Sequence, residues 1–189
     1  MKQAKVLTSN EVKRLIAVVE AGQHAERNKC AFYLTYYAGM RVKEVAALKI
    51  GDVFDSEGIA HERITLASEN TKGNSARHVL ISCRLRKILQ AYYLTLPRTS
   101  IDFALIYSQK DYGAFSANSL CQLFARLYAA AGINGASSHS GRRSFITKLA
   151  NKGVGAKVLM HLAGHKHLST TQRYIDVNDE MLMQAVELL

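Results

Sequence analysis

The sequence predicts a mostly α-helical protein with one small antiparallel sheet. Along most of the chain apolar residues recur at intervals of three and four, which is typical of amphipathic helices. Only between about 58 and 82 does the pattern change to short alternating segments that favour strands. The chain has 189 residues, 48% of them apolar and only one a proline, so it can bury a core of its own. We expect a single domain over 1–189.

The first helices have recognisable boundaries. Thr8 and Glu11 fit a capping box ahead of an apolar stripe. A second helix is expected from about 25 to 38, where aromatic residues are frequent and Gly39 ends the pattern. A third is expected at about 42–48, and Gly51 is interpreted as its end. The stripe of the first helix consists of Val12, Leu15, Ile16 and Val19.

The alternating segments predict a β-hairpin. They read GIAHERITLAS (58–68) and ARHVLIS (76–82), and Gly73 and Asn74 between them suit a tight turn. Two further amphipathic helices follow and are stopped by Pro97 and Gly132. Their stripes are Leu85, Ile88, Leu89 and Tyr92, then Leu120, Leu123, Phe124 and Leu127. Helical segments are also expected at about 139–151, 155–163, 169–175 and, capped by Asn178, at 178–189.

The charge of the chain favours a polyanionic partner. Its 25 Lys and Arg against 15 Asp and Glu give a formal net charge of +10. The 64 residues from Tyr112 to Ile175 contain no Asp or Glu, but they hold eight Lys or Arg and four His. Such a surface suits close contact with phosphates, because a carboxylate there would repel them. Nucleic acid is therefore the first candidate partner and an anionic membrane the second, with a merely basic soluble protein as the plain alternative.

Several classes of protein are disfavoured by the sequence. Cys30, Cys83 and Cys121 are far apart, which indicates reduced thiols, and no apolar run has the length of a signal peptide or a membrane span. We expect a cytoplasmic, nucleoid-associated protein without membrane contact. No H-E-x-x-H pattern, Walker-type loop or cluster of carboxylates occurs, so we expect no metal and no cofactor.

Two segments carry candidate chemistry within the acid-free region. In SSHSGRRSF, His139 and Arg142 lie three residues apart, so a helix starting there would place both on one face. In GHKHLSTTQRYID, His165 opens the segment and Tyr174 follows nine residues later. An arginine can donate two parallel hydrogen bonds to a phosphate, and a histidine N–H can donate one. The backbone N–H groups at a helix N-terminus also bind phosphates.

These segments resemble the catalytic domain of the tyrosine recombinase (phage integrase) family. The resemblance rests on YYAGMRVKEVAALKIGDV, the hairpin, HSGRRSFITKLANKG and LAGHKHLSTTQRYI, in this order from about 8 to 180. It implies the fold of that domain and a site-specific recombinase. Most members of the family carry a separate N-terminal DNA-binding domain, but the pattern here begins almost at Met1, so we expect none in this chain. A naturally minimal recombinase and an excised catalytic domain are both open. The resemblance also implies six catalytic residues, namely Arg41, Lys72, His139, Arg142, His165 and Tyr174.

Each of these residues has an implied role. Arg41 and Arg142 would clamp the scissile phosphate, and His165 would donate to one of its oxygens. Lys72 would be the general acid for the leaving 5′ oxygen, His139 would assist proton transfer, and Tyr174 would attack phosphorus to form a 3′-phosphotyrosine. Glu44 and Asp52 match positions that support the segment of the first arginine. Residues expected to contact DNA are Arg143, Lys148, Lys166 and Arg173.

The chain departs from the family at two positions of the H-x-L-R-H motif. Gly141 replaces the leucine, which should affect packing only, and Arg143 replaces the second histidine and adds a cation. The expected partner is double-stranded DNA, bound by a tetramer that is a monomer without DNA. The last helix would close the core or pack on a neighbouring protomer.

Other functions remain open at this point. Taken alone, Tyr174 and the histidines are ordinary structural residues, and Lys72 is a solvated turn lysine. A catalytically idle DNA-binding regulator on the same fold is one alternative, and a type IB topoisomerase-like relaxase is another. An RNA-binding protein is disfavoured, because the aromatic and glycine signature of common RNA modules is missing.

Overall fold

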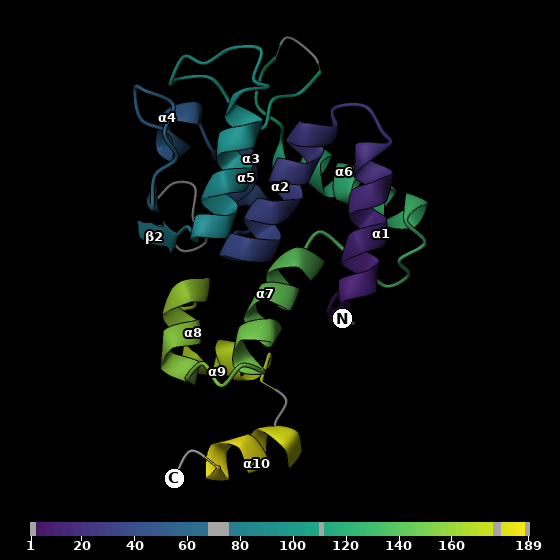
Figure 1. The fold of residues 1–189 in the computed structure, drawn as a ribbon, viewed down its shortest axis with the longest axis vertical. Coiled ribbons are helices and arrows are strands. Elements are labelled where there is room, and N and C mark those ends of the chain that lie inside the picture. Colours follow the sequence, from purple (N-terminus) through teal and green to yellow (C-terminus); the bar gives the residue numbers. More distant parts are fainter. Residues whose placement is uncertain (1–2, 68–75, 110–111, 176–178, 188–189) are drawn as a thin grey trace.

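The computed structural model describes residues 3–67, 76–109, 112–175 and 179–187 (Figure 1). Within these ranges most residues with regular structure are helical. The helices are α1 (Ser9–Glu20), α2 (Ala25–Ala38), α3 (Val42–Ala47), α4 (Ile50–Val53), α5 (Cys83–Tyr93), α6 (Ala117–Ala130), α7 (Ser140–Ala150), α8 (Ala156–Ala163), α9 (Leu168–Gln172) and α10 (Asp179–Val186). The strands are β1 (Arg63–Leu66) and β2 (Arg77–Leu80). The prediction of a mostly α-helical fold with one small antiparallel sheet is confirmed.

The start of α1 has the predicted capping box. The Thr8 hydroxyl accepts a hydrogen bond from the Glu11 backbone N–H at 3.2 Å, and the Glu11 carboxylate accepts from the Thr8 N–H at 3.0 Å. Two backbone donors at the helix end, which have no partner within the helix, are thereby satisfied. Leu15 and Val19 of the predicted stripe are buried, so the apolar face of α1 packs into the core.

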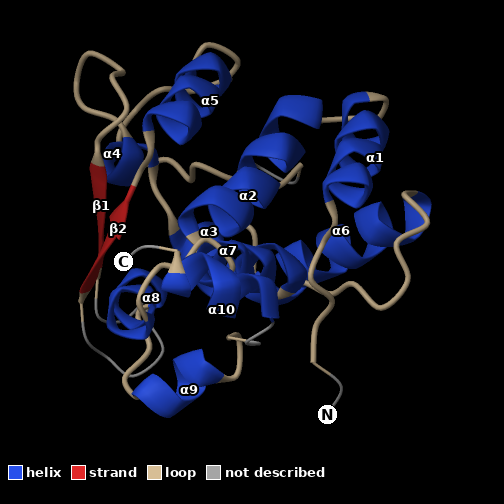
Figure 2. Ribbon diagram, turned by 60° about the horizontal axis from the view of Figure 1, so that its bottom comes forward, coloured by secondary structure: helices blue, strands red, loops and turns tan. Residues whose placement is uncertain are grey.

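The two strands pair as the alternation predicts. They are antiparallel, with Ile64 opposite Val79 and both side chains buried (Figure 2). Each strand has four residues and is shorter than its alternating segment. The turn residues Gly73 and Asn74 lie outside the described residues.

Two helix boundaries differ from the predicted ones. The interpretation of Gly51 as a helix end is wrong, because this residue lies inside the short helix α4. The N–H groups of Ile50 and Gly51 donate to the carbonyls of Phe103 and Ile101, each at 2.9 Å, so a distant loop supports this turn. The helix α9 ends at Gln172, so Tyr174 lies just beyond it and not within it.

The helices form two groups. One hydrophobic core is built from residues between Leu7 and Ile133, which belong to α1 to α6, the sheet and the segments that connect them. Helices α7, α8 and α9 lie together on one side of this core, and α2 contacts α7 (Figure 1). Helix α10 is set off beyond α9, and Leu182, Met183 and Val186 on it are exposed. Asn178, its expected cap, lies outside the described residues.

The described part of the chain contains no helix with the length and apolarity needed to cross a membrane. All three cysteines are free thiols, and Cys30 is buried.

Candidate active site: an arginine cluster beside Tyr174

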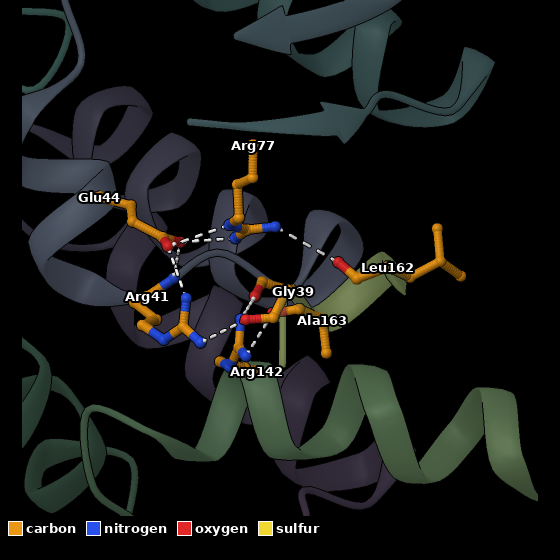
Figure 3. A network of polar contacts seen from close by, with 8 residues as sticks. Gly39, Arg41, Glu44, Arg77, Arg142, Leu162 and Ala163 are labelled. Carbon is orange, nitrogen blue, oxygen red and sulfur yellow. Dashed lines mark hydrogen bonds and ion pairs between the residues drawn. The ribbon is translucent and has the colours of Figure 1, made fainter. Parts of the chain in front are cut away.

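Arg41 is held at the start of α3 by a buried carboxylate. Its Nη1 donates to Glu44 Oε1 and its backbone N–H donates to Glu44 Oε2, each at 2.7 Å (Figure 3). The chain reaches this position through Gly39, whose φ of +63° is unfavourable for other residues. A Cβ atom on Gly39 would lie 2.5 Å from Phe145, so the approach of α2 to α7 also requires glycine.

Arg142 lies in the first turn of α7 and is only 5% exposed. Its Nη2 donates to the carbonyl of Ala163 at 2.6 Å, and its Nη1 donates to the carbonyl of Gly39 (Figure 3). Burial and the neighbouring charge of Arg41 lower the pKa of Arg142 to about 9, while Glu44 acts in the opposite direction. The guanidinium therefore stays charged at neutral pH.

Arg77 completes the cluster and was not among the predicted site residues. From β2 its Nη2 and Nε donate to the two oxygens of Glu44 at 2.7 and 3.1 Å (Figure 3). Glu44 thus binds two arginines that lie on different elements. Its side chain has no exposed surface. The only sequence signal for Arg77 was its place in a strand next to the predicted catalytic turn, and that signal does not distinguish a buried arginine from a solvated one.

Backbone carbonyls at the C-terminal ends of α2 and α8 orient the arginines. At the end of α2 it is the carbonyl of Gly39, which accepts from Arg142. Leu162 and Ala163 end α8, and their carbonyls accept from Arg77 at 3.4 Å and from Arg142. The carbonyl of Gly164, which follows, accepts from Arg41 at 3.0 Å. Carbonyls at a helix C-terminus lack partners within the helix and lie at the negative end of its dipole, so they suit guanidinium groups. Three guanidinium charges face one carboxylate, and the excess of positive charge fits an anion such as a phosphate.

His165 lies in the link between α8 and α9, beside this cluster. The sequence places it near a helix start, and the structure puts the N-cap of α9 two residues later, at His167. Burial, together with the charges of Arg142, Arg41 and Arg77, lowers the pKa of His165 to about 4. Its imidazole is therefore neutral at pH 7. The Nδ1 atom lies 3.0 Å from the hydroxyl oxygen of Thr171.

The ring of Tyr174 is packed against His165. The two ring centroids are 5.6 Å apart and the planes are inclined by 25°, which is a stacked arrangement. The guanidinium carbon of Arg143 lies 5.4 Å from the centroid of the Tyr174 ring, within the range of a cation–π contact. The carbonyl of Tyr174 accepts a long hydrogen bond, 3.5 Å, from the Thr147 hydroxyl on α7. The structure therefore brings four predicted catalytic residues together, namely Arg41, Arg142, His165 and Tyr174.

The other two predicted catalytic residues are His139 and Lys72, and no described contact joins either of them to the cluster. His139 is the N-cap of α7, one turn before Arg142, and its side chain is exposed. Among the described residues, no hydrogen bond or ring contact joins its imidazole to the arginines or to Tyr174. Lys72 lies outside the described residues.

The four predicted DNA contacts have different surroundings. Lys166 and Arg173 are exposed at the two ends of α9. Arg143 lies over Tyr174. Lys148 is half-buried, and its ammonium donates to the Tyr36 hydroxyl and lies 4.8 Å from the centroid of that ring. The part of all four residues in DNA binding stays a prediction.

A cleft of about 430 Å³ opens beside the cluster. It lies between the hairpin and α8 and shares Arg77, Gly164 and His165 with the site. Its lining includes five Arg or His side chains and no carboxylate. The surroundings of the cluster are thus basic as well. The acid-free region contributes His161 and His165 to this lining, and the two strands contribute Arg63, Arg77 and His78.

A family model matches the part of the chain that contains these residues. The model of the phage integrase family matches residues 5–181. The chain belongs to the phage integrase family. The resemblance found from the sequence motifs is thereby confirmed, and the matched range, residues 5–181, contains every residue of the cluster described above.

Named members of the family are similar over almost all of this chain. Tyrosine recombinase XerA of Pyrococcus horikoshii is 31% identical over 183 residues, which cover 97% of this chain and 60% of the relative. Tyrosine recombinase XerD of Neisseria meningitidis serogroup B is 31% identical over 189 residues, covering 96% and 62%. The chain thus spans about three-fifths of the length of these curated relatives.

Solved structures of this family have the same fold. The crystal structure of XerA recombinase superposes with a TM-score of 0.75 at 25% identity and covers 98% of this chain and 66% of that one. The integrase of transposon Tn1549, solved in complex with a circular intermediate DNA, superposes with a TM-score of 0.78 at 15% identity, covering 100% and 67%. The predicted fold of the tyrosine recombinase catalytic domain is confirmed.

Proposed function

We propose that this chain is the catalytic domain of a site-specific DNA recombinase that cuts and rejoins double-stranded DNA through a covalent 3′-phosphotyrosine. The observation that carries the proposal is the contact of the Tyr174 ring with His165, next to the guanidinium groups of Arg41 and Arg142. A nucleophilic hydroxyl and a cationic phosphate site are thus within one small region. The similarity to proteins named tyrosine recombinases supports the same reaction.

The cleavage step exchanges one phosphate ester for another. The Tyr174 oxygen attacks phosphorus, its proton passes to a base that His139 provides or assists, and the bond from phosphorus to the 5′ oxygen breaks. Lys72 gives the leaving oxygen its proton, so a 5′-hydroxyl is released. Charge that develops on the non-bridging oxygens is stabilised by Arg41, Arg142 and His165, which are already oriented by the protein. The reverse step rejoins the strand without ATP or a metal.

The assembly and location follow from the same reaction. Exchange of strands between two duplexes needs four cleavages, so we infer a tetramer on DNA formed from monomers. The exposed side chains of Leu182, Met183 and Val186 on α10 suit packing on a neighbouring protomer. A DNA-acting protein of this kind would work in the cytoplasm, at the nucleoid.

Covalent trapping on nicked DNA tests the proposal. Duplexes taken from repeats that flank the gene are nicked near the expected cleavage point, so that a short strand diffuses away after cleavage and the adduct accumulates. We expect the wild-type protein to form a covalent adduct. Tyr174→Phe should lose it and still bind the DNA, whereas the control Tyr112→Phe, in an exposed tyrosine of another region, should keep it. Sedimentation of the same mixtures measures the assembly.

Each other result points to a different function. An undiminished adduct in Tyr174→Phe would show that another residue is the nucleophile. Salt-sensitive DNA binding without any adduct in the wild type would indicate the catalytically idle regulator. Relaxation of supercoiled plasmid without strand exchange would indicate a relaxase of the topoisomerase type.

A further inference from the structure

Thr171 is a buried residue that contacts the proposed site from α9. Its side chain has no exposed surface, and its Oγ1 lies 3.0 Å from His165 Nδ1. A buried hydroxyl needs a hydrogen-bond partner, and one that is cut off from water must find it within the protein. The imidazole of His165 provides that partner. The contact therefore occupies one of the two ring nitrogens of His165 and leaves Nε2 for a ligand.

The chemistry of a phosphate decides which nitrogen must carry the proton. Phosphate oxygens accept hydrogen bonds, so the nitrogen that faces them must be an N–H donor. A neutral imidazole has one donor and one acceptor nitrogen. His165 is neutral at pH 7, because burial and the three arginines lower its pKa to about 4. If Nε2 is the donor, Nδ1 must accept, and the Thr171 hydroxyl is the group that can donate to it.

We propose that Thr171 is a positioning residue that donates to His165 Nδ1 and so holds His165 as the Nε2–H tautomer that can donate to the scissile phosphate. The inference rests on the proposed function and adds a residue to it. No bond forms or breaks at Thr171. Its effect is that the neutral imidazole presents a hydrogen to the phosphate instead of a lone pair.

The same turn also positions the proposed nucleophile. The Tyr174 N–H donates to the carbonyl of Thr171 at 2.9 Å, and the Tyr174 ring stacks on His165. Thr171 thus contacts His165 through its side chain and Tyr174 through its backbone. A substitution that removes only the hydroxyl leaves the second contact intact, so the two roles can be separated.

The test compares variants that differ in this hydroxyl. Thr171→Val has nearly the same shape without the hydroxyl, and Thr171→Ser keeps it. Thr170→Val is the matched control, because it removes a neighbouring threonine hydroxyl from the same helix without touching the bond to His165. Nitrogen NMR of protein with ¹⁵N-labelled histidine gives the tautomer of each imidazole at pH 7, and the His165 signals are assigned by their loss in His165→Gln.

We expect the wild type, Thr171→Ser and Thr170→Val to show His165 protonated at Nε2 alone. Thr171→Val should show a mixture of both tautomers. In single-turnover trapping on nicked DNA, Thr171→Val should form the covalent adduct about tenfold more slowly, the effect of one hydrogen bond. Its DNA binding should be unchanged, and Thr171→Ser should recover most of the rate.

Two results would overturn the inference. One is a wild-type His165 that carries its proton on Nδ1 or on both nitrogens. The tautomer of His165 is measured in the wild-type protein, so this result tests the role of Thr171 even if Thr171→Val does not fold. The other is a Thr171→Val protein with an unchanged tautomer and rate. Failure of the proposed function is distinguishable, because it would appear as an adduct that survives Tyr174→Phe or as a wild type that forms no adduct, whatever the tautomer of His165.

Discussion

At the scale of single residues, Glu44 holds the arginine cluster together. Its carboxylate binds Arg41 and Arg77, which come from different elements, while Arg142 lies nearby and forms no ion pair within the described part of the chain. Burial alone would favour the neutral acid. The hydrogen bonds and charges of Arg77 and Arg41 outweigh burial and lower the pKa of Glu44 below its ordinary value. The site therefore depends on an ionised carboxylate that has no contact with solvent.

Glu44→Gln should destabilise the protein by about 3 kcal/mol near pH 7, because it leaves two partly buried guanidinium groups without their counter-charge. The pH dependence follows from the lowered pKa of Glu44. Its contribution to stability is fully present above the ordinary glutamate pKa, and it is lost as the pH falls through the folded-state pKa. Urea unfolding of both proteins between pH 3 and about 7 measures this difference.

Glu57→Gln is the control for this experiment, since Glu57 is an exposed carboxylate in a turn. It should change the stability by less than about 0.5 kcal/mol at any pH. A stability difference between wild type and Glu44→Gln that does not shrink in acid would show that Glu44 is not ionised in the folded protein.

At the scale of elements, the site depends on the close packing of α7 against α2. Gly141 is the residue of α7 at which the two helices approach. A Cβ atom there would lie 2.1 Å from Thr35 Oγ1 and 3.0 Å from Thr35 Cβ. The resemblance to the family motif implies that Gly141 stands where many members have leucine. The structure gives the reason, because this α2–α7 packing has no room for a side chain.

Gly141→Ala should therefore lower the free energy of unfolding by about 2 kcal/mol, even though alanine favours a helix more than glycine does. The double variant Gly141→Ala with Thr35→Ala should recover part of the loss, because it removes the nearest atom. Thermal or urea unfolding of the single and double variants gives the coupling energy.

Gly155→Ala is the matched control, since a Cβ atom on Gly155 meets nothing within 4 Å. This change should stay within about 0.5 kcal/mol. Equal effects of the two substitutions would mean that α2 and α7 separate easily, in disagreement with the contacts described here.

At the scale of the whole molecule, charge is distributed unevenly. The net charge is +10, and the region without carboxylates contains α6, α7, α8 and α9. The last three of these helices lie together (Figure 1), and with the segments that join and follow them they hold Arg142, His165 and Tyr174. We therefore expect the binding of duplex DNA to be driven largely by release of counterions from phosphates.

DNA affinity should fall steeply with salt. The slope of log K against log salt concentration is negative, and its magnitude should fall by about 0.9 for each lost phosphate contact. Lys166→Gln and Arg173→Gln, both at exposed positions beside the site, should each reduce it by about that amount. The control Lys13→Gln, at an exposed position of α1 away from the site, should leave the slope unchanged. Fluorescence anisotropy over a salt series measures these slopes, and equal slopes for all variants would contradict the proposed binding face.

Much of the fold could be predicted because it depends on local sequence. The capping box at Thr8, the glycine that ends α2 and the alternation in the two strands are short patterns, and the structure agrees with each. The short helix α4 could not be predicted, since its first turn is supported by a loop about 50 residues away. The end of α9 before Tyr174 was also missed, because apolar periodicity does not distinguish a helix from the turn that follows it.

Local sequence was enough to predict the fold class, the order of the elements other than α4, the basic character of the chain and the motifs that contain Arg41, Arg142, His165 and Tyr174. These properties depend on composition and on spacings of a few residues. The tertiary structure alone decided that Arg77 shares Glu44 with Arg41, that helix ends hold the arginines and that Thr171 bonds His165. The partners of the arginines are as far as 123 residues apart along the chain, so only the packing of α3, α7, α8 and the hairpin brings them together.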